Sequence, residues 1–348
     1  MHRVHAQMFH DILCNRCMDI NMDIDTSPNK YYQILNQYQA AQLLFEAIRL
    51  DIFSYLDIPA TTQKLAALTG YDTKNVELLL LALASCGYIE QKEDTYKNTP
   101  HGTEYLSKAS MHYLGETILF RETMSSLSDI GNKVRGKSHI PTDLFYDFPK
   151  LARLAIPEMY ATGRVKAFQA EIKKIFPDTS AELKILDLGG GSGILSIEFV
   201  KSYPNSKAII FEYPNVAKVA GEIIDEHKAG KSVSVLTGDF NSDDIGASYD
   251  LIIASGVLDF TTEDLNSFID KIANALSENG YLLLIGRFSK TEGYPQDNML
   301  NWLWGYMNGI APPLTQKRIE TATENAHLKY VQDIQSGRFS GYLYRREG

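Results

Sequence analysis

Short apolar runs with β-branched residues recur in the second half of the chain and indicate buried strands. Between the first two runs, residues 194–203 carry apolar side chains at helical spacing. Alternation of strands and helices in this order predicts an α/β sheet. The runs that we interpret as strands are 183–188, 207–211, 232–240, 249–258 and 280–288.

The segment 31–106 has a different pattern, which predicts a mainly helical domain. It opens with a long helix, and two shorter helices are expected over 61–70 and 72–90, each ending near a glycine. Two short strands follow around residues 93–94. This order is typical of a winged helix-turn-helix domain. The apolar side chains of the first helix are Ile34, Leu35, Tyr38, Ala41, Leu44, Phe45 and Ile48.

A winged helix can bind DNA, but the charges here oppose that function. The expected second short helix exposes Asp72, Asn75 and Glu77, and its only basic residue is Lys74. The whole chain has a net charge of −9 and a pI of about 5.4. Binding of phosphate groups needs clustered Lys and Arg, so we expect no nucleic-acid partner.

The composition is that of a soluble enzyme. A length of 348 residues suggests two domains, and an apolar fraction of 44% is enough for sizeable cores. Three cysteines do not make a disulfide framework, which predicts a cytoplasmic protein. The longest apolar run, 76–84, contains Glu77 and is too short to cross a bilayer. The first residues lack an apolar core segment, so we expect no secretory signal. We therefore expect no membrane partner.

The first thirty residues carry three histidines, four methionines and the pair Cys14 and Cys17. Two interpretations are open. One is a zinc site on His5, His10 and the two cysteines. The other is a disordered extension, which we favour because a single CxxC without a second spaced pair is a weak metal motif. We predict no metal.

The most informative motif follows the strand over 183–188. Gly189, Gly191 and Gly193 alternate behind it and lead into the helix. A strand, glycine turn and helix present backbone N–H groups to a ligand. A dinucleotide site needs a third Gly or Ala where Ile194 stands, so we do not predict NAD. Asp187 at the strand's end indicates instead a ligand with an ammonium group and hydroxyls.

Two further strand ends carry acids that suit a nucleoside. Glu212 closes the second strand, 23 residues after Gly189, near the separation at which an acid binds a ribose diol. The third strand ends in Asp239 and Phe240. An Asp beside an aromatic ring can bind an adenine amino group and cover the base. Together the three strand ends predict one nucleoside-like ligand.

These motifs resemble those of class I S-adenosylmethionine-dependent methyltransferases. More narrowly, the chain is similar to the O-methyltransferases that include caffeate, acetylserotonin and antibiotic enzymes. The similarity extends from about Tyr31 onward. It rests on LDLGGGSG (186–193), FEYPNV (211–216), GDF (238–240) and DLIIASGVLDFTTEDL (250–265).

The resemblance implies a Rossmann-like sheet, S-adenosylmethionine as cofactor, and a winged-helix domain that pairs two subunits as a homodimer. It divides the chain into an extension (1–30), a dimerisation domain (31–106), a helical linker (107–182) and the cofactor-binding domain (183–348). The implied cofactor-binding residues are Asp187, Gly189, Gly191, Glu212, Asp239, Phe240 and Ser255.

In similar enzymes, helices corresponding to the linker and to 298–314 cover the methyl acceptor. Both tryptophans of the chain lie in the second segment, which favours an aromatic or polycyclic acceptor with a hydroxyl group. The predicted acceptor residues are Tyr113, Phe120, Met159, Trp302 and Met307, with Met124 and Tyr160 as further candidates.

The expected catalytic histidine is missing. In the resembling family a histidine stands nine residues after the Asp that begins the fourth strand, and here Asp259 stands nine residues after Asp250. Asp259 could act as a general base if burial raises its pKa, or it could only orient a hydroxyl. His101 and His112 are candidates only if the fold brings them close.

Three functions stay open at the level of sequence. The first is O-methylation of a small molecule. The second is methylation of carbon or nitrogen, or a non-methylating use of the same cofactor. The third is a winged-helix regulator, which the acidic recognition helix disfavours.

Overall fold

The computed structural model describes residues 28–124, 126–137, 146–261, 264–286, 288, 296–310, 314–336 and 339–347. The possible zinc ligands near the N-terminus lie outside the described residues. Two compact units divide between Glu46 and Ala47. This position differs from the predicted boundary at residue 106, and the division into four segments stays a prediction.

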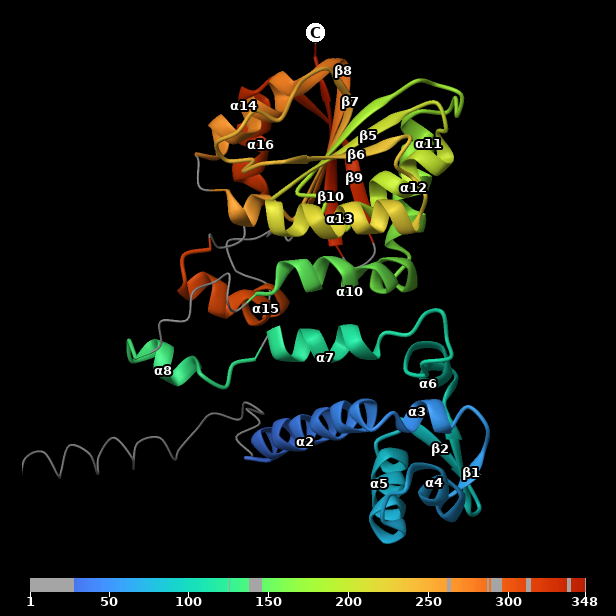
Figure 1. The fold of residues 1–348 in the computed structure, drawn as a ribbon. Helices are drawn as coiled ribbons and strands as arrows, with labels where there is room; N and C mark the ends of the chain where they lie inside the picture. The colour runs from blue at the N-terminus through green and yellow to red at the C-terminus, as the bar shows by residue number, and fades with distance from the viewer. Residues whose placement is uncertain are drawn as a thin grey trace, which may run out of the picture. The chain divides into compact units, whose positions relative to one another are not determined.

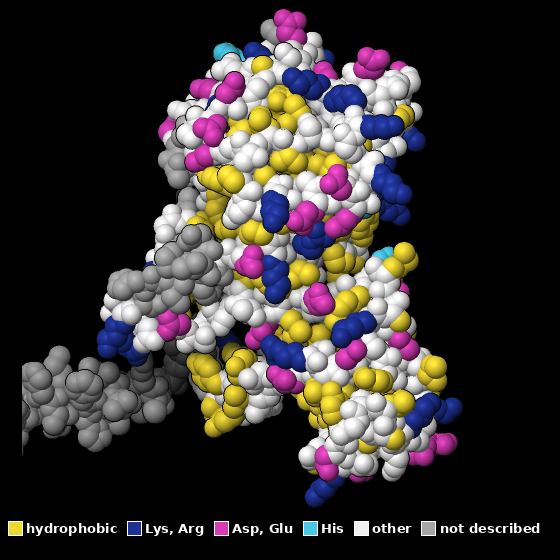
Figure 2. All heavy atoms as spheres, in the orientation of Figure 1, with side chains coloured by type: hydrophobic (Ala, Val, Ile, Leu, Met, Phe, Trp, Pro, Cys, Tyr) yellow, Lys and Arg dark blue, Asp and Glu magenta, His cyan; other side chains and the backbone are white. Residues whose placement is uncertain are grey.

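The described part of the first unit is most of helix α2 (Asn29–Arg49), drawn in dark blue in Figure 1. Only Ala47 and Ile48 of this helix are buried. The large side chains near its start are exposed, and Tyr31 reaches 73%. Figure 2 shows hydrophobic side chains gathered over this helix. The large apolar side chains of this face are therefore exposed among the residues that the structure describes.

The second unit begins with a small winged-helix fold, which confirms the predicted order of elements. A three-stranded antiparallel sheet, in the order β1-β3-β2, packs with short helices. Polar caps fix their ends: the Asp72 carboxylate accepts from the Asn75 N–H at 2.9 Å, and Gly70 ends a helix at a φ of +74°. The elements are α3 (Ile52–Tyr55), β1 (Ala60–Thr61), α4 (Thr62–Thr69), α5 (Thr73–Ser85), β2 (Ile89–Lys92), β3 (Thr95–Asn98) and α6 (Pro100–Tyr105).

Helices follow, as the apolar pattern of 107–182 predicts. The described ones are α7 (Gly115–Met124), α8 (Ile130–Val134), α10 (Phe148–Ala161) and α11 (Arg164–Ile175). A further helix, α15 (Gln296–Met307), lies later in the chain. In the part of the chain that the structure describes, no helix has both the length and the apolar character needed to cross a membrane.

A seven-stranded sheet forms the largest part of the second unit. Its order is β6-β5-β4-β7-β8-β10-β9, with the first five strands parallel and β10 antiparallel to both of its neighbours (Figure 1). The strands are β4 (Lys184–Leu188), β5 (Lys207–Glu212), β6 (Val233–Thr237), β7 (Tyr249–Ser255), β8 (Leu276–Gly286), β9 (Leu328–Ser336) and β10 (Phe339–Arg346).

Helices bury both faces of this sheet, which explains the continuous apolar runs. Side chains alternate along β4: Leu186 and Leu188 belong to one core cluster and Ile185 to the other. The first cluster includes residues of α14 (Leu265–Ala275) and α16 (Gln316–Asn325). The second includes residues of α11, α12 (Ile194–Ser202) and α13 (Pro214–Glu226).

The strand predictions need four corrections. The fifth predicted strand, 280–288, begins earlier, at Leu276, and ends at Gly286. The third predicted strand runs only to Thr237, and the fourth ends at Ser255 because Gly256 turns the chain at a φ of +75°. Beyond that turn, Leu258 lies in a 3₁₀ helix, η1 (Leu258–Phe260). The sheet also contains β9 and β10, which the sequence pattern did not predict.

Candidate functional site

A cavity of about 800 Å³ opens at the carboxyl ends of β4, β5 and β7. In an α/β sheet this edge is the usual ligand site, because strand ends and helix N-termini meet there. Strand ends and helix α10 supply much of its wall. Ten predicted site residues lie on that wall: Asp187, Gly189, Gly191, Glu212, Asp239, Phe240, Ser255, Asp259, Met159 and Trp302.

The turn after β4 strongly favours glycine at two positions. Gly189 has a φ of +62°, and a Cβ there would lie 2.4 Å from Cγ1 of Val257. Gly193 has a φ of +68°, and a Cβ would lie 2.1 Å from Cδ1 of Ile210. Both the positive φ and the close contact make a side chain unfavourable at either position. The backbone of the turn therefore borders the cavity directly.

The Glu212 carboxylate is held at the end of β5 by two backbone groups. The Gly191 N–H donates to Oε1 at 3.0 Å, and the Tyr213 N–H donates to Oε2 at 2.9 Å. The residue is 8% exposed, and this burial raises its pKa while the two hydrogen bonds lower it. Each carboxylate oxygen has further lone pairs for a ligand hydroxyl.

Asp187 is the more deeply buried acid, with 2% exposure. The Ser196 hydroxyl donates to its Oδ2 at 3.0 Å. Burial raises the pKa of the Asp187 carboxyl to about 7, although the Ser196 hydrogen bond and the charge of Arg164 act in the opposite direction. A cationic ligand group beside it would favour the ionised form.

Asp239 lies at the third strand end in a hydrogen-bonded group. Its Oδ1 accepts from the Tyr213 hydroxyl at 2.7 Å and from the Asn241 N–H at 2.8 Å. Burial acts to raise the pKa of Asp239, but these hydrogen bonds outweigh it and the pKa is lowered. Burial and the bond to Asp239 raise the pKa of Tyr213 to about 12. Phe240 stands edge-on to Tyr213, with ring centroids 5.8 Å apart.

Arg164 is a site residue that the sequence reading missed. It begins α11 directly after Gly163, which has a φ of +73°. Its Nη2 donates to the Ser255 hydroxyl, and its guanidinium stacks over the Phe339 ring at 5.2 Å. One arginine at a helix start carries no sequence signal. Only folding brings its charge to the wall that also contains Asp187.

Two models of known families match the chain. The O-methyltransferase dimerisation domain matches residues 32–108, and the O-methyltransferase domain matches residues 165–310.

The chain belongs to the O-methyltransferase family.

It is an S-adenosylmethionine-dependent methyltransferase.

Individual relatives agree with this membership. The chain is 28% identical to an uncharacterized protein of Methanocaldococcus jannaschii, MJ0086, across 89% of this chain and 85% of the relative. It is 25% identical to an L-tyrosine C(3)-methyltransferase of Streptomyces lavendulae, across 75% of each. Human N-acetylserotonin methyltransferase, solved in complex with S-adenosylmethionine, is similar in fold, with a TM-score of 0.67. The two sequences are 21% identical, and the match covers 94% of this chain and 100% of the human chain.

The cavity of this methyltransferase fits its cofactor chemically. Two carboxylates, Asp187 and Glu212, and the guanidinium of Arg164 border the same space. S-adenosylmethionine carries an ammonium, a carboxylate and a ribose diol, which these groups can bind. The buried Asp187 carboxyl, whose pKa is raised, is the observation that most favours a cationic partner.

The other part of the cavity wall is aromatic. Phe260 meets Phe148 edge-on at 5.4 Å and Trp302 at 5.7 Å between ring centroids. Trp302 in turn lies 5.1 Å from Tyr146. Of these rings, Phe148, Phe260 and Trp302 line the cavity. Phe148 and Phe260 were not predicted. Flat faces of this kind suit an aromatic ligand.

Asp259 lies on the wall of the same cavity. It is the middle residue of η1, the 3₁₀ helix that follows the turn at Gly256. Its neighbours Val257 and Phe260 also line the cavity. The alternative histidines do not: His112 pairs with Glu104, and His101 stacks on Tyr105 with centroids 6.4 Å apart. Neither histidine belongs to the cavity wall.

Three of the predicted acceptor residues lie off the cavity wall. Tyr113 precedes α7, where its ring lies over Gly115. Phe120 packs against the cluster of Tyr146 and Trp302, with the Lys150 ammonium 5.4 Å from its ring. Met307, at the end of α15, is 38% exposed. A helix presents only one side to a cavity, and the sequence did not identify that side. Met124, a further candidate, is buried behind the wall.

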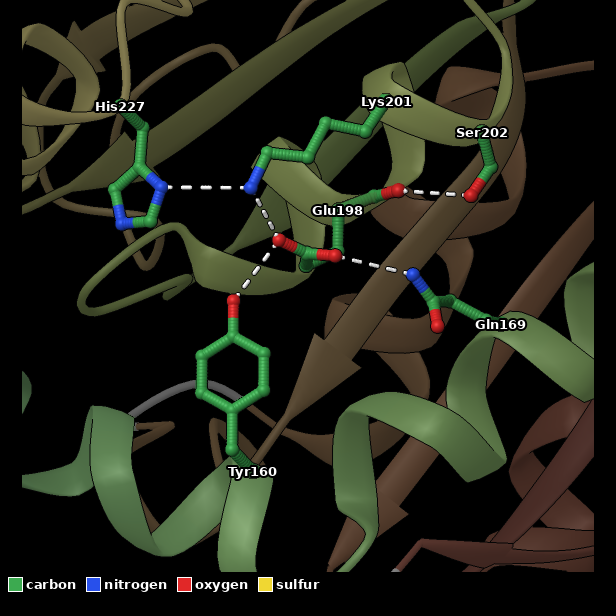
Figure 3. Close-up of polar contacts among 6 residues, drawn as sticks. All are labelled: Tyr160, Gln169, Glu198, Lys201, Ser202 and His227. Atoms are coloured by element: carbon green, nitrogen blue, oxygen red, sulfur yellow. Dashed lines mark hydrogen bonds and ion pairs between the residues drawn. The ribbon is translucent and has the colours of Figure 1, made fainter. Parts of the chain in front are cut away.

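Tyr160 also faces away from the cavity, into the polar cluster of Figure 3. Its hydroxyl donates to Oε1 of Glu198 on α12 at 2.9 Å. Burial raises the pKa of the Tyr160 hydroxyl most, and this hydrogen bond raises it further. Gln169 of α11 donates to Oε2 at 3.1 Å, and Lys201 donates to Oε1 at 2.6 Å. The Glu198 carboxylate therefore joins α10, α11 and α12.

Proposed function

We propose that this methyltransferase transfers a methyl group to a hydroxyl of an aromatic or polycyclic small molecule. The observation that carries the proposal is the continuity of one cavity from the glycine turn to the rings of Phe148, Phe260 and Trp302. The family model, an O-methyltransferase domain, favours oxygen as the acceptor atom. The tyrosine-methylating relative favours an aromatic acceptor.

We assign a role to each cofactor-binding group. Asp187 binds the ammonium and Arg164 the carboxylate of the amino-acid end, beside the turn at Gly189 and Gly191. Glu212 accepts the ribose hydroxyls. Asp239 and Phe240 hold the adenine, and Ser255 fixes Arg164 through the hydrogen bond from that guanidinium.

The chain's contribution to the reaction is alignment. Bound S-adenosylmethionine supplies an electrophilic methyl group. The aromatic wall and Met159 hold the acceptor, and Asp259 accepts a hydrogen bond from its hydroxyl and so directs an oxygen lone pair. Orientation of this kind can lower a barrier by several kcal/mol. Residues of α10 and Trp302 of α15 cover part of the cavity.

Carbon methylation is the second candidate, because the family's histidine position is occupied by Asp259 and because one relative methylates C3 of L-tyrosine. The ring carbon beside a phenol would then occupy the place of the oxygen. Both candidates use the same cavity and the same cofactor.

Labelled S-adenosylmethionine distinguishes these functions. The protein is incubated with it and a panel of phenols, naphthols and their carboxylated derivatives, and labelled products are identified by mass spectrometry and NMR. An O–CH₃ product supports the proposal and a C–CH₃ product supports the second candidate.

Glu212→Ala should weaken cofactor binding by roughly 1–3 kcal/mol. If calorimetry detects no binding heat for either S-adenosylmethionine or S-adenosylhomocysteine, both candidate functions are refuted.

A further inference from the structure

An ion pair between α7 and α10 lies on the mostly apolar wall of the cavity. Arg121 of α7 donates to Oε2 of Glu158 on α10 through Nε at 2.9 Å, and also through Nη2. Both side chains line the cavity and are largely buried, with exposures of 26% and 14%. Other apolar and aromatic residues of the same cavity wall are Phe148, Leu151, Ala155, Met159, Phe260 and Trp302.

An ion pair in this position needs an explanation beyond stability. Taking two charges out of water costs free energy that their attraction only partly offsets, so a hydrophobic pair would join α7 to α10 at least as well. The helices are already joined by another bond, from the Thr117 hydroxyl to the Leu154 carbonyl at 2.7 Å. In a ligand cavity, a few polar groups in an apolar wall set orientation and specificity.

The donors of Arg121 indicate what it can bind. Nε and Nη2 both donate to a single oxygen of Glu158, which fixes the plane of the guanidinium. Its Nη1 group makes no hydrogen bond or ion pair with the residues that the structure describes. A guanidinium held in this way presents remaining N–H groups to a second carboxylate, the partner that its planar geometry suits.

The charges around the cavity separate two anion sites. Arg121 and Arg164 are the cations among the described lining residues. Arg164 lies against Ser255 and Phe339, beside the amino-acid end of the cofactor site. Arg121 is paired with Glu158 on the wall, and Asp259 lines the same cavity. A ligand anion would therefore compete with Glu158 for the guanidinium, while its hydroxyl faces Asp259.

We propose that the acceptor is an aromatic hydroxy acid whose carboxylate binds Arg121, an inference that rests on the proposed function. Glu158 is the positioning residue for that arginine and also the competitor of the ligand. The ring occupies the aromatic wall, and the hydroxyl to be methylated meets Asp259. Arg121 thus determines specificity for acids over neutral phenols.

Binding of defined probes tests this without methyl transfer. Calorimetry with the full chain and saturating S-adenosylhomocysteine compares hydroxynaphthoates with the matching hydroxynaphthamides, which are neutral and similar in shape. We expect at least one acid to bind about tenfold or more tightly than its amide. Arg121→Gln should remove that difference, and Arg121→Lys should retain part of it, because a lysine keeps the charge without the planar fork.

Glu158→Gln separates recognition from a structural role. Removing the competing carboxylate should tighten acid binding several-fold, whereas a purely structural pair would lose binding in either variant. Arg153→Gln is the matched control, because Arg153 on the same helix pairs with Glu222 and Glu226 outside the cavity. It should leave the acid preference unchanged.

Each outcome has one meaning. Acids that bind no better than their amides, or not at all, overturn the inference, and so does an acid preference that survives Arg121→Gln. Heat from S-adenosylhomocysteine in the same samples shows that the protein is folded and the cofactor site is functional. Loss of that heat in the unmodified protein would instead overturn the proposed function.

Discussion

Asp187 is the single residue whose ionisation should govern cofactor affinity. Burial raises the pKa of its carboxyl to about 7, against about 3.9 for an exposed Asp. Without ligand, Asp187 of the folded protein therefore stays protonated up to about pH 7. In the unfolded chain the same carboxyl loses its proton near pH 4. Ionisation in the folded state costs stability, so this group lowers the free energy of unfolding as the pH rises between those values.

Cofactor binding should have the opposite dependence on pH. An ammonium beside Asp187 favours the carboxylate, so binding below pH 7 releases its proton. We expect the dissociation constant of S-adenosylhomocysteine to rise by up to about tenfold per unit as pH falls from 7 to 5. Calorimetry in buffers of different ionisation enthalpy would count the proton. Asp187→Asn should bind weakly with little pH slope, and an equal slope in both proteins would contradict the assignment.

Substitutions of Asp259 test how far methyl transfer depends on a general base. We expect alignment to dominate, so Asp259→Asn should lose less than about a hundredfold in turnover. A loss of two to four orders of magnitude with a single ionisation would show a general base instead. Asp259→His restores the residue of the resembling family. A gain in phenol methylation would show that the usual mechanism has been weakened here, and no gain would show that the site serves different chemistry.

At the scale of elements, the Glu198 cluster fixes the helices that carry the acceptor wall. Glu198 is 8% exposed and receives bonds from α10, α11 and its own helix α12 (Figure 3). The residues next to Tyr160 on α10, including Glu158 and Met159, face the cavity. One side of the helix therefore anchors it while the other side forms the wall.

Removing one bond of the cluster should have a measurable cost. Tyr160→Phe leaves a buried carboxylate oxygen with one donor fewer, so we expect the free energy of unfolding to fall by about 1 kcal/mol. Urea denaturation measures it. Tyr330→Phe is the control, because its hydroxyl donates to Asp333 in an exposed position and should contribute close to nothing. Equal losses in the two variants would show that Glu198 is not a special junction.

At the scale of the whole molecule, the exposed face of α2 predicts association. Tyr31, Ile34 and Tyr38 are each more than half exposed, and the match to a dimerisation domain begins at residue 32. Exposed apolar faces of this kind mark interfaces between proteins. We propose that two copies of the chain pair through their N-terminal domains and cover this face.

Light scattering checks the pairing. The chain of 39.1 kDa should behave as a particle of twice that mass at tens of micromolar. Ile34→Asp and Tyr38→Asp together should shift it toward the monomer by placing charge in an apolar interface. Asn36→Asp is the control, because helical spacing puts it on the opposite side of α2. The proposed pairing would be contradicted if the unmodified protein were a monomer, or if only the Asn36→Asp variant dissociated.

The sequence by itself determined the sheet and its cofactor-binding edge. Strands buried on both faces must be apolar at nearly every position, so runs such as 183–188 and 249–255 could be recognised. The carboxyl ends of parallel strands meet at one edge, so Asp187, Glu212 and Asp239 converge whatever the loops between them do. The glycine turn is equally local, because positive φ values strongly favour glycine.

Only the tertiary structure decided the acceptor part. Helices there choose their inward side by packing, so Met159 and Trp302 reached the cavity while Tyr113, Phe120 and Met307 did not. The arginines were invisible in the sequence because no spacing rule links Arg121 to Glu158, or Arg164 to Ser255. The edge strand β9 could not be predicted for a related reason. Polar side chains interrupt its apolar pattern, and its strand conformation depends on pairing with β10.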